Sequence, residues 1–313
     1  MSTPLDVRAL LDPEVAAALT AIPFDLGILS DATLPAIRAG FAAAPPLPLS
    51  DQVERSDHAI PGRAGVSVRV HRPKGASGAL PCVYWIHGGG LILGNNKQDD
   101  LRFDRWCQSL SCVGVSVDYR LAPESRYPEP LEDCYVGLRW VRDNAAALGV
   151  DPRRLGIGGA SAGGGLAAGL ALLARDRGEI ALAFQALIYP MLDDRMITAS
   201  SQWIDPVWPP SANRYGWRSY LGELGDAAVP AYAAPARASD LSRLPRTFIS
   251  VGALDGFSDE DIDYAARLRR AGVATELHVY PGAPHGFDGL AAGTAIAKRA
   301  NRDIEEWLAA ALR

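Results

Sequence analysis

Short apolar runs recur along most of the chain, and longer segments with helical periodicity separate them. Seven of these runs are short and rich in β-branched or aromatic residues, as buried strands are; they lie at 66–70, 83–86, 113–117, 155–157, 184–189, 247–251 and 276–280. Strands that alternate with helices pair in parallel, because each connection must cross back over a face of the sheet. The pattern therefore predicts an α/β fold with a mainly parallel central sheet and helices on both faces.

Two regions depart from this alternation. Before the first strand, two short helical patterns at 15–19 and 37–41 precede a proline-rich connector at 44–49, and they are too short to fold alone. Before the strand at 247–251, an insert carries many aromatic residues and prolines. We therefore predict three parts: N-terminal cap helices and their connector at 1–48, an α/β body at 49–199 and 239–313, and a cap insertion at 200–238.

The segment after the strand at 247–251 has the period of an amphipathic helix. Its apolar side chains recur on one face, which we expect to pack on the sheet: Ile262, Ala265, Leu268 and Ala271. Ser258 and Asp261 match a helix-capping pattern, and the acids at 259–261 suit the positive end of a helix dipole. This pattern predicts a structural role for these acids.

Candidate chemistry begins with a serine in a Gly-x-Ser-x-Gly pattern at 159–163, directly after the predicted strand at 155–157. The pattern is typical of a nucleophile elbow, a strand-to-helix turn that needs glycines because its backbone is crowded and strained. Such a turn exposes the serine hydroxyl, so Ser161 is the candidate nucleophile. The apolar stretch at 163–174 is too short to span a bilayer and indicates a buried helix.

A second glycine motif, His87-Gly88-Gly89-Gly90, ends the predicted strand at 83–86. Without side chains, its backbone can turn N–H groups toward a reacting carbonyl oxygen, as in an oxyanion hole. A tight turn after a buried strand is the simpler interpretation. The occurrence of this motif together with the candidate elbow favours the oxyanion-hole interpretation.

A serine nucleophile needs a base, and the base needs an orienting carboxylate. His285 is the candidate base, because it lies in a glycine- and proline-rich loop after the strand at 276–280. The other histidines have different explanations: His87 belongs to the glycine motif, His278 lies within a predicted strand, and His58 and His71 precede the motifs.

Asp255 is the candidate orienting acid. It follows the strand at 247–251, and open α/β sheets place functional groups at the carboxyl ends of their strands. Asp193 and Asp194 follow the strand at 184–189 in the same way and remain the alternatives.

Five motifs, in this order, carry a resemblance to a known family: 87–90, 118–124, 159–163, 189–195 and 281–287. With the order serine, acid, histidine, the chain resembles bacterial hormone-sensitive-lipase-like esterases, family IV of the α/β hydrolases, over most of its length. The resemblance implies an α/β-hydrolase fold with a helical cap, and hydrolysis of carboxylic esters without cofactor or metal. It matches the triad to Ser161, Asp255 and His285, and the oxyanion hole to Gly88, Gly89 and Ala162.

Two positions depart from the family's pattern. Ala160 precedes the nucleophile where aspartate or threonine is common, so no side chain can hydrogen-bond behind the elbow. Residues 256–258 stand where the family usually carries an apolar residue and a basic one, and we expect them to loosen the loop of Asp255. These departures bear on subgroup and substrate preference, and they leave the nucleophile unchanged.

Composition narrows the picture further. A chain of 313 residues with 48% hydrophobic content can bury one sizeable α/β core. A net charge of −5 and the absence of a Lys/Arg cluster argue against nucleic acid as the main partner. No signal-peptide pattern is visible, so we expect a cytoplasmic location. The four cysteines lack metal-ligand spacing and are expected to be buried free thiols: Cys82, Cys107, Cys112 and Cys134.

We therefore expect a carboxylesterase that acts on a small ester substrate and water and has no membrane partner. A capped, partly apolar cleft favours short- to medium-chain acyl esters, and Trp203 and Trp208 are candidates for its walls. The alternatives are a deacetylase or amidase with the same triad, and a non-catalytic ligand-binding protein of this fold. Relatives of this kind often pair as homodimers, and either such pairing or docking on the chain's own sheet explains the apolar residues near its end: Ile304, Trp307, Leu308 and Leu312.

Overall fold

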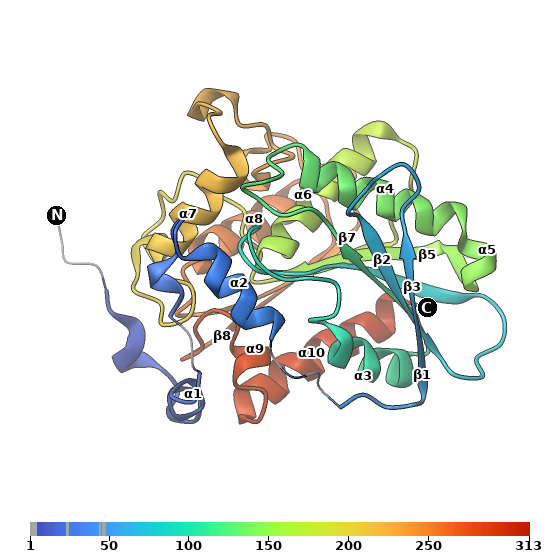
Figure 1. Cartoon of the computed structure of the whole chain (residues 1–313), viewed down its shortest axis with the longest axis horizontal. Helices are drawn as coiled ribbons and strands as arrows, with labels where there is room; N and C mark the ends of the chain where they lie inside the picture. The colour runs from blue at the N-terminus through green and yellow to red at the C-terminus, as the bar shows by residue number, and fades with distance from the viewer. Residues whose placement is uncertain (1–4, 23–24, 44, 46–47) are drawn as a thin grey trace.

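The computed structural model of the protein describes residues 5–22, 25–43, 45 and 48–313, so residues 44, 46 and 47 of the predicted connector lie outside it. Within the described residues, eight strands form one sheet in the order β1-β2-β4-β3-β5-β6-β7-β8 (Figure 1). Both pairings of β2 are antiparallel, and the other neighbours are parallel. The strands are β1 (Val53–Ala59), β2 (Ser67–Pro73), β3 (Leu80–Ile86), β4 (Val113–Asp118), β5 (Val150–Ala160), β6 (Phe184–Ile188), β7 (Arg246–Gly252) and β8 (Thr275–Tyr280).

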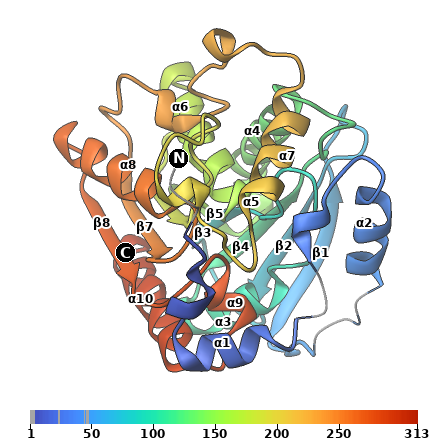
Figure 2. The ribbon, with the colours of Figure 1, turned by 90° about the vertical axis from the view of Figure 1, so that its left-hand side faces the viewer.

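Helices cover both faces of this sheet. Figures 1 and 2 show α4, α6 and α8 on one side of it and α3 and α10 on the other. The helices are α1 (Pro13–Leu19), α2 (Leu34–Ala42), α3 (Asp100–Leu110), α4 (Glu129–Asp143), α5 (Ala145–Leu148), α6 (Ala162–Arg177), α7 (Pro210–Leu221), α8 (Ser258–Arg270), α9 (Phe287–Leu290) and α10 (Ala295–Ala311), with short 3₁₀ turns η1 (Val7–Leu10), η2 (Leu26–Ile28), η3 (Ser200–Gln202), η4 (Asp226–Ala228) and η5 (Pro235–Arg237). The predicted α/β architecture is confirmed. No described helix is both long and apolar enough to cross a membrane.

Two apolar layers, one on each face of the sheet, form most of the core, and a smaller third cluster joins α1, α9 and the start of α10. In β3, Tyr84 and Ile86 belong to the layer beneath α4 and α6, whereas Trp85 belongs to the layer beneath α3 and α10. Successive side chains of a strand point to opposite faces, so a strand buried on both faces is apolar throughout. In the second layer, the rings of Trp85 and Trp106 meet edge-on with centroids 5.3 Å apart.

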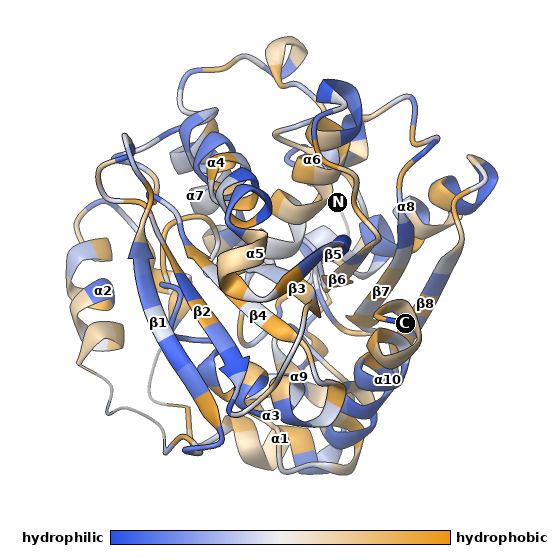
Figure 3. Cartoon of the chain, turned by 90° about the vertical axis from the view of Figure 1, so that its right-hand side faces the viewer, coloured by the Kyte–Doolittle hydropathy of each residue, from blue (hydrophilic) through white to orange (hydrophobic). Residues whose placement is uncertain are grey.

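The hydrophobic pattern found β2 to β8 and missed β1. Of the residues in β1, only Val53 is buried, and Figure 3 shows this strand as mostly hydrophilic. An edge strand can be held by backbone hydrogen bonds to one neighbour while its side chains face water. Hydrophobic periodicity carries no signal for such a strand.

The apolar residues near the end of the chain pack within the protein. Ile304, Trp307, Leu308 and Leu312 of the α10 region are buried in the layer beneath that helix. The ring of Trp307 lies 5.8 Å from that of Phe184 and 5.5 Å from that of Phe248, measured between centroids. Docking on the chain's own sheet therefore explains these residues without a second copy.

Helix α8 buries most of the predicted face. Ala265 and Leu268 are buried and Ala271 packs against the core, but Ile262 is 41% exposed, and Asp261 and Tyr264 are buried in addition. The predicted capping pattern is also wrong, because Ser258 is the first helical residue and no side chain caps the helix. Neither carboxyl oxygen of Asp261 has a hydrogen-bond partner among the described residues, and burial raises its pKa well above the ordinary value.

A buried ion pair links the motif at 118–124 to α4. Arg120 donates from Nε and Nη2 to the two oxygens of Asp133 at 2.7 and 2.8 Å, and the Asp133 side chain is fully buried. Without Asp133, Arg120 keeps its longer contact to Glu129 at 3.4 Å but loses the bidentate pair with a fully buried carboxylate.

We expect Asp133→Ala to lower the free energy of unfolding by about 3 kcal/mol, measured by urea denaturation. The matched control is Asp143→Ala, because the Asp143 pair with Arg142 is exposed and such pairs contribute less than about 1 kcal/mol. Equal losses of unfolding free energy in both variants would contradict a stabilising role of the Arg120–Asp133 pair.

Candidate active site

Ser161 lies in the tight turn between β5 and α6. Its backbone angles are φ 57° and ψ −124°, and such a conformation costs a non-glycine residue on the order of 1–3 kcal/mol. Neighbouring backbone holds the turn, since the Ser161 amide donates to the Ile188 carbonyl at 2.8 Å and the Ser161 carbonyl accepts from the Met191 amide at 3.0 Å. The strained turn is thus fixed by the end of β6 and the segment after it.

The glycines around Ser161 are required by close packing. A Cβ at Gly159 would lie 2.3 Å from the carbonyl oxygen of Gly163, and a Cβ at Gly163 would lie 2.0 Å from the carbonyl oxygen of Ile86 in β3. Backbone atoms at these distances cannot move aside. The first turn of α6 therefore packs directly on the end of β3, which brings Ser161 beside the loop at 87–90.

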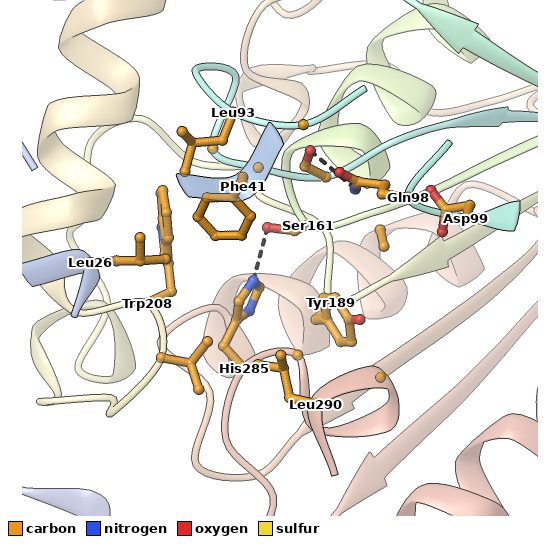
Figure 4. Close-up of a pocket in the computed structure, with 18 of the residues that line it drawn as sticks. Leu26, Phe41, Leu93, Gln98, Asp99, Ser161, Tyr189, Trp208, His285 and Leu290 are labelled. Atoms are coloured by element: carbon orange, nitrogen blue, oxygen red, sulfur yellow. Dashed lines mark hydrogen bonds between the residues drawn. The ribbon is translucent and has the colours of Figure 1, made fainter. Parts of the chain in front are cut away.

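The structure brings His285 and Asp255 to Ser161. Nε2 of His285 lies 2.8 Å from Oγ of Ser161 (Figure 4), and Nδ1 lies 2.8 Å from Oδ2 of Asp255. An ionised carboxylate can only accept hydrogen bonds, so Nδ1 carries the proton and Nε2 accepts the serine O–H. The other oxygen of Asp255 accepts from the Phe257 amide at 2.9 Å, which fixes the acid at the end of β7.

The surroundings of His285 favour its charged form. Burial by itself would lower the pKa of His285, but Asp255, with smaller contributions from Asp205 and Asp288, outweighs burial and raises it. Phe257 is buried and meets the imidazole edge-on, with ring centroids 5.1 Å apart. Phe257 therefore packs the acid loop against His285.

The loop at 87–90 leaves backbone donors free beside Ser161. The Gly88 carbonyl accepts from Nδ1 of His87 at 2.8 Å and from Nε2 of Gln98 at 3.4 Å. Because a peptide unit is planar and trans, the Gly89 N–H points away from these partners. Within the described residues, no hydrogen bond has an amide of Gly88, Gly89 or Ala162 as its donor.

His87 supports this loop as a neutral side chain. Its ring is fully buried and stacks on Tyr119, with centroids 4.3 Å apart, and the Tyr119 hydroxyl donates to the His87 carbonyl at 3.1 Å. Burial lowers the pKa of His87 to about 4. Its imidazole is therefore uncharged near neutral pH.

The alternative acids are paired elsewhere. Asp193 accepts from Nε of Arg195 at 2.7 Å and Asp194 from Nε of Arg237 at 2.6 Å, so neither orients His285.

The acids at the start of α8 bind the backbone of the insert and the segment before it. Asp259 accepts from the Ser200 amide at 2.9 Å, and Glu260 accepts from the Leu192 amide at 2.7 Å.

A cavity of about 330 Å³ opens at Ser161 and His285. Leu26 and Phe41 from the N-terminal segment and Val207 and Trp208 from the insert contribute to its walls. In Figure 4, Phe41, Leu26 and Trp208 lie on one side of Ser161. Trp208 thus lines the cavity as expected, whereas Trp203 is not among the lining residues.

The opposite side of the cavity is polar, and no sequence pattern indicated it. Arg102 of α3 donates from Nε to Asp99 and from Nη2 to Asp288, both at 3.3 Å. The Tyr189 hydroxyl donates to the other oxygen of Asp288 at 2.5 Å. Gln98, Asp99 and Arg102 line the cavity on this side, so the cavity has one apolar and one polar wall. The described residues contain no cluster of three or more His, Cys, Asp or Glu placed to hold a metal ion.

Fold and site together define an α/β hydrolase, and comparison with known proteins gives the same result. A family model described as the alpha/beta hydrolase fold matches residues 83–289. Esterase LipI of Mycobacterium tuberculosis is 35% identical over 91% of this chain and 90% of its own length. Carboxylesterase NlhH of the same species is 34% identical, with 92% of each chain covered.

A solved structure is equally similar. The structure titled Bacterial Heroin Esterase superposes with a TM-score of 0.89 at 40% identity, covering 98% of this chain and 99% of that one. The chain belongs to the hormone-sensitive-lipase-like family of α/β hydrolases. It is a carboxylic ester hydrolase.

We expect Gly89→Ala to lower kcat by about 10²–10³-fold, the usual effect of losing an oxyanion donor. Gly89 has φ 118°, and a Cβ there would lie 2.2 Å from the Leu93 carbonyl oxygen, so the loop must move. Steady-state kinetics on an activated ester measures the effect. Gly293→Ala, where a Cβ meets no atom within 4 Å, is the control; an unchanged kcat in Gly89→Ala would show that the loop is not needed.

Proposed function

We propose that this protein is a serine carboxylesterase that hydrolyses short- to medium-chain acyl esters through an acyl-enzyme on Ser161. One observation carries the proposal: an unbroken hydrogen-bonded chain runs from Oγ of Ser161 through His285 to Asp255, with both links at 2.8 Å. Ser161, at one end of this chain of hydrogen bonds, lines the cavity and is held in a strained turn. A structural serine would need neither the strain nor the buried base.

Acylation follows from this geometry. Nε2 of His285 takes the hydroxyl proton as Oγ of Ser161 attacks the ester carbonyl carbon, and a C–O bond forms while the carbonyl π electrons move to oxygen. The free amides of Gly88, Gly89 and Ala162 are the donors for that oxyanion. When the oxyanion collapses, the ester C–O bond breaks, and the leaving alkoxide takes the proton back from His285.

Deacylation repeats the sequence with water. His285 removes a proton from a water molecule, and the resulting hydroxide attacks the acyl carbon. Collapse of the second oxyanion releases the carboxylic acid and returns the proton to Ser161. Throughout, Asp255 keeps the proton on Nδ1 and stabilises the imidazolium.

The cavity supports a preference for small acyl groups. Its volume of about 330 Å³ lies at the lower end of the roughly 300–1,000 Å³ of small-molecule sites. We propose that residues 1–48 and 200–238 form the cap, because both contribute apolar walls through Leu26, Phe41, Val207 and Trp208. A long acyl chain would have to extend beyond these walls.

The decisive test is hydrolysis of p-nitrophenyl esters from acetate to palmitate by the parent protein and Ser161→Ala. We expect the highest kcat/KM at short chains and a loss of activity in the variant on the order of 10⁶-fold, as in other triads. Ser116→Ala is the matched control, because Ser116 is buried in β4 away from the cavity.

Two outcomes would contradict this proposal. Activity retained in Ser161→Ala would remove the serine from the mechanism. Highest activity on palmitate would remove the acyl-chain preference and leave the mechanism intact. If only amide or N-acetyl substrates are cleaved, the same triad serves an amidase or deacetylase.

The pH dependence of kcat/KM tests the base. Only neutral His285 can accept the serine proton, and its pKa is raised above the ordinary 6.5. Activity is therefore expected to fall as the pH drops, with the midpoint of this acid limb above 6.5. An acid limb centred well below that value would exclude His285 in this environment as the base.

A further inference from the structure

Asp205 is a buried carboxylate of the insert that contacts the histidine loop. It is 2% exposed, and its Oδ2 accepts from the backbone amide of His285 at 2.9 Å. Its Oδ1 accepts from the amides of Val207 at 2.7 Å and Trp208 at 3.1 Å. One carboxylate therefore binds both the backbone of the candidate base and the backbone of a cavity wall.

Trp208 connects the Asp205 contacts to the glycine loop at 87–90. Its ring packs so closely on Gly90 that a Cβ there would lie 2.1 Å from the ring. Its centroid also lies 6.4 Å from that of His285. A shift of Trp208 would therefore disturb the cavity wall, the base and the loop at 87–90 together.

The N-terminal segment supports Asp205 from outside. The Ile204 amide donates to the Leu5 carbonyl at 2.8 Å, and Asp6 forms an isolated parallel bridge with Ile204. Asp205 also borders a second, separate cavity that Arg8 and Asp25 line. These contacts fix the backbone on which Asp205 is carried.

Charged groups reach His285 from three separate segments. Asp255 faces the ring from the loop after β7, Asp205 from the insert and Asp288 from α9. Ser161 is the hydrogen-bond partner on the cavity side, and Arg102 pairs with Asp288. Burial and the repulsion of Asp255 raise the pKa of Asp205 to about 6, so it is ionised near neutral pH.

We propose that Asp205 is a positioning residue for His285, which it holds by the backbone and stabilises by charge, and that it couples the Trp208 wall to the base. The inference rests on the proposed role of His285 as base. Three buried amides converge on one carboxylate, and a buried donor left without a partner is costly. The carboxylate also lies close enough to favour the imidazolium that forms in each transition state.

Asparagine cannot reproduce these contacts. Its single carbonyl oxygen can accept either from His285 or from Val207 and Trp208, and its NH₂ group then faces a donor on the other side. Asp205→Asn therefore preserves size, breaks one of the two links and removes the charge. Asp193→Asn is the matched control, because Asp193 is buried, belongs to the segment before the insert, and binds Arg195 rather than the histidine loop.

The first experiment compares kcat, KM and the pH profile of the parent and both variants on p-nitrophenyl acetate. In Asp205→Asn we expect kcat to fall by about tenfold to 100-fold, as small displacements of catalytic groups do. Loss of a nearby negative charge lowers the pKa of His285, so the acid limb should move to lower pH. Asp193→Asn should change neither quantity.

The second experiment reads the imidazole directly. The chain has five histidines, so ¹⁵N-labelled histidine and the variant His285→Ala identify the His285 ring signals by NMR. In the parent, these signals should titrate with a pKa above the ordinary 6.5. In Asp205→Asn the titration should move to lower pH, because a nearby negative charge is lost. If Asp205→Asn does not fold, Asp205→Glu replaces it: this variant keeps the charge but displaces the carboxylate, so kcat should fall while the pKa of His285 stays raised.

The outcomes separate this inference from the proposed function. An unchanged acid limb and kcat in Asp205→Asn, or an imidazole titration that does not move in that variant, would overturn the role of Asp205. A rise in KM alone would also overturn it, because only the cavity wall would then be affected. A parent without esterase activity whose His285 titration still moves to lower pH in Asp205→Asn would refute the proposed function and leave the coupling intact.

Discussion

The site depends on the close packing of the first turn of α6 on the end of β3. Because the amide and carbonyl of Ser161 are bound to Ile188 and Met191, and Gly163 fits against the Ile86 carbonyl with no room for a Cβ, the serine cannot relax to an ordinary conformation. This one contact sets the distance between Ser161 and the backbone amides at 87–90. The large buried core supplies the stability that maintains the strain, since local strain persists only where the surroundings determine it.

Burial and charge act against each other around the base. Removing His285 from water would favour its neutral form, while three carboxylates favour the charged form. The pKa of His285 is raised on balance, so the carboxylates prevail over burial. On the polar side of the cavity, Arg102 lies between Asp99 and Asp288, so this side combines buried charge of both signs. The opposite, apolar side takes side chains from the segment before β1 and from the insert between β6 and β7.

The errors of the sequence interpretation share a cause. In α8, the predicted stripe included the exposed Ile262 and left out the buried Asp261, because an acid does not count as apolar in a periodicity argument. The apolar pattern also missed strand β1, because an edge strand can carry polar side chains that face water. Trp203 and Trp208 look alike in the sequence, and only Trp208 reaches the cavity. Composition alone cannot distinguish two aromatic residues of one insert.

The sequence by itself determined the parallel sheet, the serine turn, the glycine loop and the histidine loop. Each of these is a local backbone conformation, and apolar runs, glycines and prolines encode such conformations directly. Only the tertiary structure decided that Asp255 rather than Asp193 or Asp194 meets His285, that Asp205 binds the histidine loop, and that Arg102 lines the cavity. Those facts depend on contacts between segments far apart in the chain, and no local pattern records which distant side chain will lie opposite.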